Sequence, residues 1–467
     1  MDKPALTMVS LGCARNTVDS EQMLAAFVER GWLIAARATD ADLLLINTCG
    51  FIEDAREESS EVIEQAAALK EAGRVSAVVV VGCLVQLQRA ELPARFPAVD
   101  AWVGLAEPEL IADACETALE SSDPSPTTAF PEPAARSLES RPRLRITPRH
   151  SAYLRIAEGC LNRCNYCLIP AIRGPLRSRP EEGLLDEARS LIEDGARELM
   201  VIGQDTTNYG LDLYDERRTA PLLRRLRKLD GLEWLRLLYA HPAHISEDLI
   251  DVLAEGRPIL PYIDIPIQHA SPRILDAMGR GTNPDELRAV IGRVRERLPS
   301  PTIRTSVIVG YPGETDADFD ELTRFITEMR FERLGAFAYS PEEGTPAAEM
   351  EGQVPEEVKA ERLDAVMTLQ QEIANEQSEA LIDTEIDVVV DGKDIDGVWV
   401  GRTVRDAPDV DGSIRFEDTT LEAGLFGRAR VSEAYQYDLV GRMVHAGNAA
   451  DPSGESPVNE ADYGGRD

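Results

Sequence analysis

The sequence predicts an α/β protein with three folded parts: an N-terminal parallel α/β domain, a central partial (β/α)6 barrel and a small C-terminal β-barrel. Apolar, strand-like runs alternate with charged, helical stretches over most of the chain, which is typical of parallel sheets covered by helices. After about residue 380 the pattern changes to short strands separated by turn residues, which is typical of a small barrel. The length of 467 residues also exceeds the ~250–300 residues at which a single core stops growing, so several domains are expected.

The N-terminal domain is expected to span residues 1–120 and to begin with a βαβαβ pattern. Its strand-like and helical runs alternate at residues 7–11, 20–30, 43–47, 54–72 and 77–81.

Each strand-like run of this domain leads into a cysteine, and these are Cys13, Cys49 and Cys83. Because parallel strands end at one edge of a sheet, the three thiols can converge although 36 and 34 residues separate them along the chain. The pattern therefore predicts a three-thiolate site. The alternative is three ordinary buried cysteines, which is how we interpret Cys115, a helix residue to which we assign no role.

A proline-rich segment, residues 121–148, is predicted to be an extended linker. The alternation of strands and helices resumes after it, and residues 149–380 are predicted to form the partial barrel. Its six strands are expected at residues 152–156, 198–202, 235–239, 262–265, 303–309 and 334–339. Catalytic groups of such barrels lie where the strands end, so the active site is expected at that edge.

The C-terminal region is predicted to hold a long polar helix at residues 354–380 and then a small β-barrel over residues 381–445. Its five short strands are expected at residues 386–390, 398–402, 413–416, 427–433 and 437–442. Residues 446–467 are rich in Gly, Ser, Pro and acidic residues and are predicted to be a disordered tail.

Three further cysteines lie within eight residues, directly after the first predicted barrel strand: Cys160, Cys164 and Cys167. Three thiolates are one too few for a closed tetrahedral zinc site, whereas a four-iron, four-sulfur cube held by three cysteines keeps one iron open to an outside molecule. The alternatives are a zinc site or a disulfide with a spare thiol. Zinc sites favour CxxC pairs with a distant fourth ligand, and neither His150 nor His241 has that register. The CxxxCxxC spacing therefore predicts an iron-sulfur cluster that takes part in chemistry.

The cysteine content and the first residues of the chain indicate the cellular compartment. The seven cysteines form no secreted disulfide framework and the first residues contain no long apolar segment, so a reducing cytoplasm is expected. No stretch approaches the ~20 apolar residues of a membrane span, so we expect a soluble protein without a membrane partner.

The net charge is strongly negative. The chain has 83 acidic and 49 basic residues, a formal charge of −34, and such a surface repels nucleic acid unless its basic groups are clustered. Two interpretations stay open: a surface suited to a basic protein partner, or adaptation to high intracellular salt. Because the acid excess runs along the whole chain, it does not identify a substrate by itself.

Together these motifs give the chain a resemblance to the radical S-adenosylmethionine (SAM) methylthiotransferases, and the resemblance covers nearly the whole chain. This family has an N-terminal cluster domain, a partial radical-SAM barrel and a C-terminal TRAM domain. One branch modifies tRNA adenosine (MiaB-like), and the other modifies an aspartate of the small-subunit ribosomal protein S-twelve (RimO-like). Sequences that resemble the second branch are SLGCARNTVDSE at 10–21, NTCGFI at 47–52, QDTTNYG at 204–210, DIPIQHAS at 264–271 and YSPEEGT at 339–345. Ala14 and Arg15 depart from the Pro-Lys that is common in that branch.

The resemblance implies two four-iron, four-sulfur clusters and SAM as cofactors. The CxxxCxxC cysteines would hold the cluster that splits SAM into methionine and a 5′-deoxyadenosyl radical, once an electron donor has reduced it. Cys13, Cys49 and Cys83 would hold an auxiliary cluster whose open iron can carry the sulfur to be transferred. A second SAM would methylate that sulfur, and the product would be a β-methylthio-aspartate.

The resemblance also implies where SAM binds. The predicted SAM-binding residues are Tyr166, Gln204, Asp205, Gln268, Gly310 and Gly313. Gln204 or Asp205 would bind the methionine amino group, Tyr166 would pack near the cluster or the adenine, and the two glycines would let backbone approach the adenine.

Each of these assignments has a structural alternative. The glycines could simply make turns, and His269, beside Gln268 at the end of the fourth barrel strand, could face the site or only cap a loop. Arg173 would hold either a carboxylate or the cysteine loop itself.

The predicted TRAM-like barrel helps to choose between the two branches. It carries 13 acidic and 6 basic residues between residues 384 and 441, a net charge of −7, whereas a domain that grips tRNA phosphates needs the opposite sign. We therefore predict the ribosomal protein S-twelve as the substrate and do not expect tRNA as a partner. The rivals are tRNA 2-methylthio-adenosine synthesis and a non-catalytic iron-sulfur protein, which would not cleave SAM.

Overall fold

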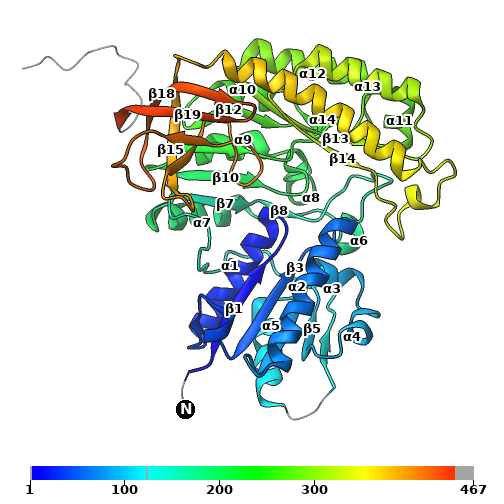
Figure 1. The fold of residues 1–467 in the computed structure, drawn as a ribbon, viewed down its shortest axis with the longest axis vertical. Coiled ribbons are helices and arrows are strands. Elements are labelled where there is room, and N and C mark those ends of the chain that lie inside the picture. The colour runs from blue at the N-terminus through cyan, green and yellow to red at the C-terminus, as the bar shows by residue number, and fades with distance from the viewer. Residues whose placement is uncertain (1–2, 122–124, 447–467) are drawn as a thin grey trace, which may run out of the picture. The chain divides into compact units, whose positions relative to one another are not determined.

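The computed structural model describes residues 3–121 and 125–446 and confirms the predicted α/β fold class. The chain divides into two units, Met1–Ile373 and Ala374–Asp467. The first unit contains two parallel sheets and the second contains a closed β-barrel (Figure 1). None of the helices in the described part of the chain is long and apolar enough to cross a membrane.

The N-terminal domain is built on a six-stranded sheet in the order β2-β1-β3-β4-β5-β6, in which all pairs are parallel. Its strands are β1 (Ala5–Ser10), β2 (Leu33–Ile34), β3 (Leu43–Thr48), β4 (Ala77–Gly82), β5 (Ala101–Val103) and β6 (Thr127–Ala129). The central strands β3 and β4 are buried along their whole length, as their continuous apolar sequences require of strands covered on both faces.

Helices cover both faces of this sheet (Figure 1). They are α1 (Ala14–Glu29), α2 (Glu53–Glu71), α3 (Cys83–Leu87), α4 (Leu92–Arg95) and α5 (Pro108–Glu120). Phe27 of α1 and Ile111 of α5 belong to the core on one face, and Ile63 of α2 belongs to the core on the other. The register pairs Ser10 with Asn47 and Asn47 with Val81, so the three strands that precede the cysteines end side by side.

The described residues of the predicted extended linker (121–148), which are residue 121 and residues 125–148, contact the folded parts on both sides. Its residues 127–129 form β6 of the N-terminal sheet. Arg136 is buried and forms an ion pair of 2.6 Å with Asp19 of α1. Arg143 pairs with Glu21 of α1 and, at 2.9 Å, with Glu187 of the barrel. The prolines indicated the extended backbone, but they carry no information about the partners of these arginines.

The central sheet has the order β14-β13-β12-β11-β10-β7 and is parallel throughout, which is the expected partial barrel. Its strands are β7 (Ser151–Arg155), β10 (Glu198–Ile202), β11 (Trp234–Leu237), β12 (Ile259–Asp264), β13 (Thr302–Val309) and β14 (Arg333–Ala338). The ends of the six predicted strands differ from these by at most three residues. A short antiparallel pair, β8 (Ala157–Glu158) and β9 (Arg177–Ser178), was not predicted.

Helices pack against the outer face of the central sheet (Figure 1). The helices of this region are α6 (Ile169–Arg173), α7 (Glu181–Glu193), α8 (Leu211–Tyr214), α9 (Thr219–Leu226), α10 (Glu247–Ala254), α11 (Pro272–Ala277), α12 (Pro284–Arg297), α13 (Asp316–Met329) and α14 (Glu356–Glu379). One continuous core joins the strands to apolar residues of these helices, such as Leu184, Leu249 and Leu322. Burial of each such side chain stabilises the fold by roughly 1.5–3 kcal/mol.

The second unit contains the predicted five-stranded barrel, closed in the order β15-β16-β17-β19-β18. Its strands are β15 (Glu385–Lys393), β16 (Trp399–Thr403), β17 (Ile414–Phe416), β18 (Phe426–Tyr435) and β19 (Asp438–Ala446). Val388, Ile414 and Val431 lie in its core. The predicted disordered tail, residues 446–467, lies outside the described residues except for residue 446.

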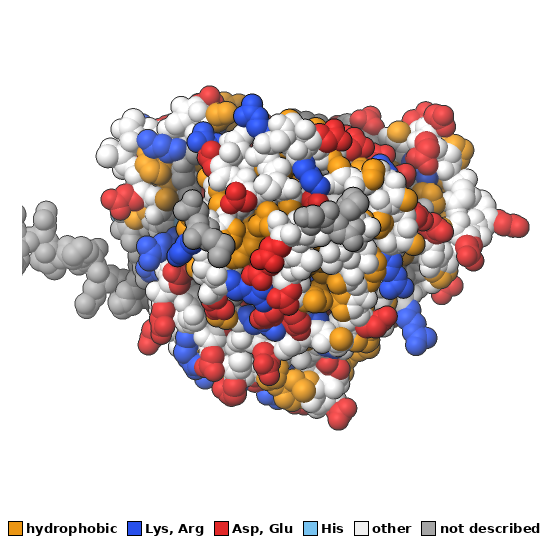
Figure 2. Space-filling model, turned by 90° about the horizontal axis from the view of Figure 1, so that it is seen from below, with side chains coloured by type: hydrophobic (Ala, Val, Ile, Leu, Met, Phe, Trp, Pro, Cys, Tyr) orange, Lys and Arg blue, Asp and Glu red, His pale blue; other side chains and the backbone are white. Residues whose placement is uncertain are grey.

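Charged side chains of both signs are interleaved over the molecular face shown in Figure 2, and hydrophobic side chains gather near the centre of that face. The interleaving agrees with the sequence, in which the acid excess is not confined to one segment.

Candidate functional site

All six cysteines predicted to bind clusters line one cavity of about 280 Å³, where the N-terminal domain meets the central barrel. Other residues that line it include Arg15, Asn16, Asn162, Tyr166, Arg173, Gln204, Asp205, Tyr239, His241, Gln268 and Arg280. Cys115 lies elsewhere, on α5 and fully buried in the core. The cavity therefore separates the cysteines with a predicted role from the one without.

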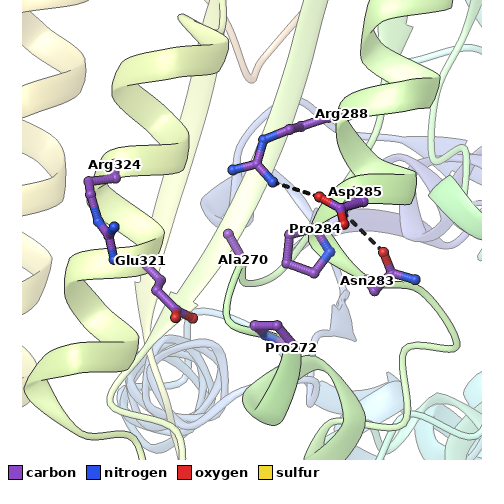
Figure 3. Close-up of a pocket in the computed structure, with 8 residues that line it drawn as sticks. All are labelled: Ala270, Pro272, Asn283, Pro284, Asp285, Arg288, Glu321 and Arg324. Atoms are coloured by element: carbon purple, nitrogen blue, oxygen red, sulfur yellow. Dashed lines mark hydrogen bonds and ion pairs between the residues drawn. The ribbon is translucent and has the colours of Figure 1, made fainter.

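A second cavity, of about 460 Å³, lies between α12 and α13 and contains no cysteine (Figure 3). Both arginines that line it have partners within the protein. Arg288 pairs with Asp285 at 3.2 Å, and Arg324 donates a hydrogen bond of 3.0 Å to the carbonyl of Asp320. The cysteine-lined cavity is therefore the candidate site for the iron-sulfur chemistry that the sequence predicts.

The N-terminal thiols are brought together by the ends of three strands. Cys13 directly precedes α1, Cys49 follows β3, and Cys83 is the first residue of α3. Gly12 has a φ of +88°, and a Cβ at this position would lie 2.7 Å from Cβ and 2.9 Å from Sγ of Cys49. Only glycine permits this approach, so the Gly-Cys sequence is a requirement of the convergence.

The CxxxCxxC thiols are held by a local loop. The β8-β9 pair closes the base of this loop, and Gly159 precedes Cys160 with a φ of +73°. A Cβ on Gly159 would lie 2.0 Å from the carbonyl oxygen of Pro175, so a side chain is excluded there.

Each of the three loop thiols accepts a hydrogen bond of 3.4 Å. The donors are the backbone N–H of Asn162 to Cys160, the backbone N–H of Ile169 to Cys167, and the Arg280 guanidinium to Cys164. Such donors stabilise thiolates, which are the form of cysteine that binds iron.

The donor set fits two iron-sulfur clusters. All the cysteines are free thiols, and three line the cavity from each domain. In the part of the chain that the structure describes, no three His, Cys, Asp or Glu side chains gather as ligands of a single metal ion would. Three guanidinium groups, from Arg15, Arg173 and Arg280, also line the cavity and can balance the negative charge of thiolate-bound clusters.

Cys13 differs in acidity from Cys49 and Cys83 of its own set and from Cys160 and Cys167 of the loop. Burial raises the pKa of Cys83 to about 11, of Cys160 to about 11 and of Cys167 to about 12. Burial also acts on Cys13, but the charges of Arg15 and Arg173 outweigh it and lower the pKa of that thiol. Cys13 is therefore the thiol of the N-terminal set that ionises most readily.

Arg173 joins the two thiol sets. It lies on α6 after the CxxxCxxC loop, and its Nη2 is 3.3 Å from Sγ of Cys83 in the other domain. Its guanidinium also pairs with Glu158 at 2.9 Å and with Asp19 at 3.2 Å. The sequence left open whether Arg173 binds a carboxylate or the loop, and the structure shows it binding two carboxylates.

The predicted SAM-binding residues Gln204 and Asp205 both line the cavity, but they differ in whether their side-chain oxygens already have hydrogen-bond partners. The carboxylate of Asp205 accepts hydrogen bonds from Asn162 at 2.7 Å and from the backbone of Thr207 at 2.9 Å, and it contacts His244 at 3.2 Å. Burial would raise the pKa of Asp205, but the hydrogen bonds from His244 and Thr207 lower it to about 2.

Gln204 donates to Glu158 at 2.7 Å, and its carbonyl oxygen is buried without a partner. It therefore retains an acceptor for a ligand such as the amino group of SAM.

The other predicted SAM-binding residues divide into two groups. Tyr166 and Gln268 line the cavity, and Gln268, in the loop that follows β12, has a positive φ of 70°. Gly310 and Gly313 are not among the lining residues. A Cβ on Gly310 would lie 2.3 Å from Cγ of Lys359, so this glycine makes room for a side chain of α14.

His269 is also absent from the cavity lining. Its Nδ1 accepts a hydrogen bond of 2.9 Å from the backbone N–H of Ser271, which is the loop-capping arrangement that the sequence allowed. Burial lowers its pKa to about 3, so the ring is neutral at physiological pH.

Several cavity residues were not identified from the sequence. Asn16 donates 2.9 Å hydrogen bonds to the carbonyls of Leu11 and Thr48, so it connects the ends of β1 and β3. Arg15 was noted only as a departure from the family, yet it lines the cavity. Arg280 and Tyr239 come from turns far from any cysteine in the sequence, and nothing local indicated their position.

Three family models match the chain, one for each predicted folded part. They are the uncharacterized protein family UPF0004 at residues 5–104, the radical SAM superfamily at residues 154–326 and the TRAM domain at residues 382–444.

Curated relatives match over nearly the whole chain. Ribosomal protein uS12 methylthiotransferase RimO of Pelotomaculum thermopropionicum is 44% identical over 94% of this chain and 98% of its own length. The RimO of Heliobacterium modesticaldum is 43% identical over 94% of both chains. The RimO of Geobacter sulfurreducens is 42% identical over 95% of this chain and 99% of its own.

Solved structures share the fold at low sequence identity. The radical SAM methyltransferase TsrM from Kitasatospora setae, with tryptophan substrate and a SAM analogue bound, is 17% identical. It aligns with a TM-score of 0.53 over 84% of this chain and 79% of that chain. The cobalamin-dependent SAM radical enzyme OxsB is 13% identical, with a TM-score of 0.50 over 79% of this chain and 56% of that chain.

Proposed function

Since this chain belongs to the RimO family of ribosomal protein uS12 methylthiotransferases, we propose that it adds a methylthio group to the β-carbon of an aspartate of uS12. It is a radical SAM enzyme whose cofactors are two [4Fe-4S] clusters and SAM. The observation that carries the proposal is that both cysteine triplets line one cavity. A substrate in that cavity can be in reach of both clusters at once.

This reaction needs its cofactors because the β-carbon of an aspartate has neither the acidity nor the leaving group that a base or nucleophile requires. When bound, the clusters and SAM supply the electron, the radical chemistry, the sulfur and the methyl group. The protein supplies the binding groups, their orientation and a cavity that limits the access of water.

The roles of the protein residues follow from their positions. Cys160, Cys164 and Cys167 would hold the cluster that cleaves SAM, and the strand-end cysteines would hold the auxiliary cluster. The unpartnered carbonyl oxygen of Gln204 would accept a hydrogen bond from the amino group of SAM. Asp205, which is ionised and accepts several hydrogen bonds, would orient Asn162 on the cavity wall and not bind SAM itself.

The proposal also concerns partners. The net charge of −7 on the C-terminal barrel supports a basic protein partner over tRNA, because a surface that binds phosphates needs the opposite sign. An external electron donor is required, since no residue of the cavity can reduce a cluster repeatedly. We place the reaction in the cytoplasm, where reducing conditions keep the thiols available.

The experiment is an anaerobic reconstitution with iron and sulfide, followed by incubation with SAM, a reductant and either uS12 or tRNA. Mass spectrometry should show a methylthio group on an aspartate of uS12 and no change of tRNA. A methylthio group on a tRNA adenosine would instead show that the chain acts like the tRNA-modifying branch of the family. If the loaded protein cleaved no SAM, the proposed reaction would be refuted.

A further inference from the structure

The cavity holds three arginines, and two of them donate a hydrogen bond to a cysteine thiol. Arg173 pairs with two carboxylates and contacts Cys83. Arg280 donates to Sγ of Cys164 at 3.4 Å and to the carbonyl of Pro266 at 2.6 Å, which places it beside the CxxxCxxC loop.

Arg15 differs from both. In the residues 3–121 and 125–446, no Asp or Glu forms an ion pair with it, and its one hydrogen-bond partner is the carbonyl of Gly203, 2.6 Å from Nη1. Its Nε is buried without a partner. A guanidinium carries five N–H groups, so most of its hydrogen-bond donors are unused. In a chain with 83 acidic and 49 basic residues, Arg15 is thus a cavity arginine with neither a carboxylate nor a thiol as hydrogen-bond partner among the described residues.

The position of Arg15 is also held by the surrounding structure. Its guanidinium lies 4.8 Å from the centroid of the Tyr239 ring, and Tyr239 has a positive φ of 60°. Such backbone strain in a residue other than glycine is retained where surrounding contacts enforce it, and here the backbone N–H of Tyr239 donates to Asp264 at 3.1 Å. Arg15 follows Cys13 by two residues, lines the cavity and donates to the carbonyl of Gly203, so it connects the N-terminal domain to the barrel.

The substrate supplies the missing partner. In an aspartate the carboxylate is bonded directly to the β-carbon, so the reacting atom cannot enter the cavity without a negative charge beside it. Two clusters with thiolate ligands make the surroundings unfavourable for that charge, and a buried carboxylate needs a cation with well-placed hydrogen bonds.

Resting on the proposed function, we propose that Arg15 binds the side-chain carboxylate of the uS12 aspartate and so positions its β-carbon between the two thiol sets. The planar fork of a guanidinium matches a carboxylate in two parallel hydrogen bonds, which fixes orientation as well as charge. Arg15 is thus a specificity-determining residue that distinguishes aspartate from asparagine.

The test combines a protein variant with a substrate variant. The variants are Arg15→Gln, which keeps much of the length but removes the charge, and Arg15→Lys, which keeps the charge. The control is Arg37→Gln, an exposed residue of the same domain whose side chain is 78% accessible. Each reconstituted full-length protein is titrated with uS12 and with uS12 whose acceptor aspartate is replaced by asparagine. Iron content and the rate of SAM cleavage without uS12 are measured in parallel.

The wild type and the control should bind normal uS12 about 10- to 100-fold more tightly than the asparagine form. Arg15→Gln should bind both forms with equal, weak affinity, and KM for uS12 should rise more than kcat falls. Arg15→Lys should recover part of the preference for aspartate. In the Arg37→Gln control, iron content and SAM cleavage without uS12 should stay at the wild-type level.

Two results would overturn this inference while leaving the proposed function intact. One is an unchanged preference for aspartate in Arg15→Gln. The other is loss of iron from that variant, which would show that Arg15 serves the auxiliary cluster and not the substrate. Failure of the wild type to modify uS12 would instead refute the proposed function, and the inference with it.

Discussion

The two cysteine triplets are assembled in opposite ways. Cys160, Cys164 and Cys167 lie within one loop, whose geometry is set by its neighbours in sequence. The other three cysteines are separated by 36 and 34 residues and meet only because β1, β3 and β4 are adjacent and in register. A local site can form when a single loop is ordered, whereas the strand-end site requires the whole sheet.

The triplets also differ electrostatically. Burial dominates around the CxxxCxxC loop and raises the pKa of Cys160 and of Cys167. Around the strand ends, Arg15 and Arg173 reverse this effect at Cys13. One of these two cations comes from α6 in the barrel, so the acidity of the N-terminal site depends on the other domain.

The largest expected effect separates the roles of the triplets. Replacement of all three loop cysteines by alanine should abolish SAM cleavage, while replacement of Cys13, Cys49 and Cys83 should leave cleavage in place and abolish methylthio transfer. Each triple variant should hold about four irons per chain, where the wild type holds about eight. Deoxyadenosine, methylthio-uS12 and iron are measured together, with Cys115→Ala as the matched control. If the second triple variant also failed to cleave SAM, the division of roles would be wrong.

Removal of the residue that joins the triplets should destabilise the first unit. Arg173→Met leaves Asp19 and Glu158 with fewer partners for their buried charges, and loss of one partner from such a network costs roughly 3–5 kcal/mol. Guanidinium denaturation of the cluster-free protein measures the change. Arg37→Met breaks an exposed pair with Asp40 and should cost less than about 1 kcal/mol. Equal effects of the two variants would mean that the network around Arg173 adds no stability.

The same network makes stability depend on pH. Burial would raise the pKa of Glu158, but Arg173 and Arg155 lower it from 4.5 to about 2. A lowered carboxyl pKa adds stability that is present above pH 4.5 and is lost as the pH falls towards 2. The contribution is on the order of 3 kcal/mol. Glu158→Gln should therefore be less stable than the cluster-free wild type at pH 7, and the difference should shrink between pH 4.5 and 2. A constant difference across that range would contradict the ion pairing.

The smallest expected effect concerns thiol reactivity. In the cluster-free protein at pH 7.5, iodoacetamide should label Cys13 at least about tenfold faster than Cys160, because the thiolate is the reactive form and only the pKa of Cys13 is lowered. Peptide mass spectrometry at several times gives both rates in one sample. Arg15→Gln should slow the labelling of Cys13 and leave that of Cys160 unchanged. Equal rates in the wild type would show that access, and not charge, governs the difference.

Much of this architecture was predictable because its signals are local. The strand-like runs, the Gly-Cys sequences and the CxxxCxxC spacing each depend on neighbouring residues, and the structure has the predicted strands at nearly the predicted bounds. The prediction was weaker for residues 121–148, where Pro indicated extended backbone but not the ion pairs of Arg136 and Arg143 with α1. The sequence also did not indicate that Lys359, from a distant helix, packs against Gly310, whose role in SAM binding stays a prediction.

The sequence by itself determined the three folded parts and the two sets of cysteines, because these rest on spacing and periodicity along the chain, and its motifs carried the resemblance to the family. Only the tertiary structure decided that both sets line one cavity, that Arg173 connects them and that Arg15 enters the cavity without a carboxylate partner among the described residues. The physical reason is that ion pairing and burial depend on distances between residues remote in sequence, and these distances exist only after the two sheets have packed together.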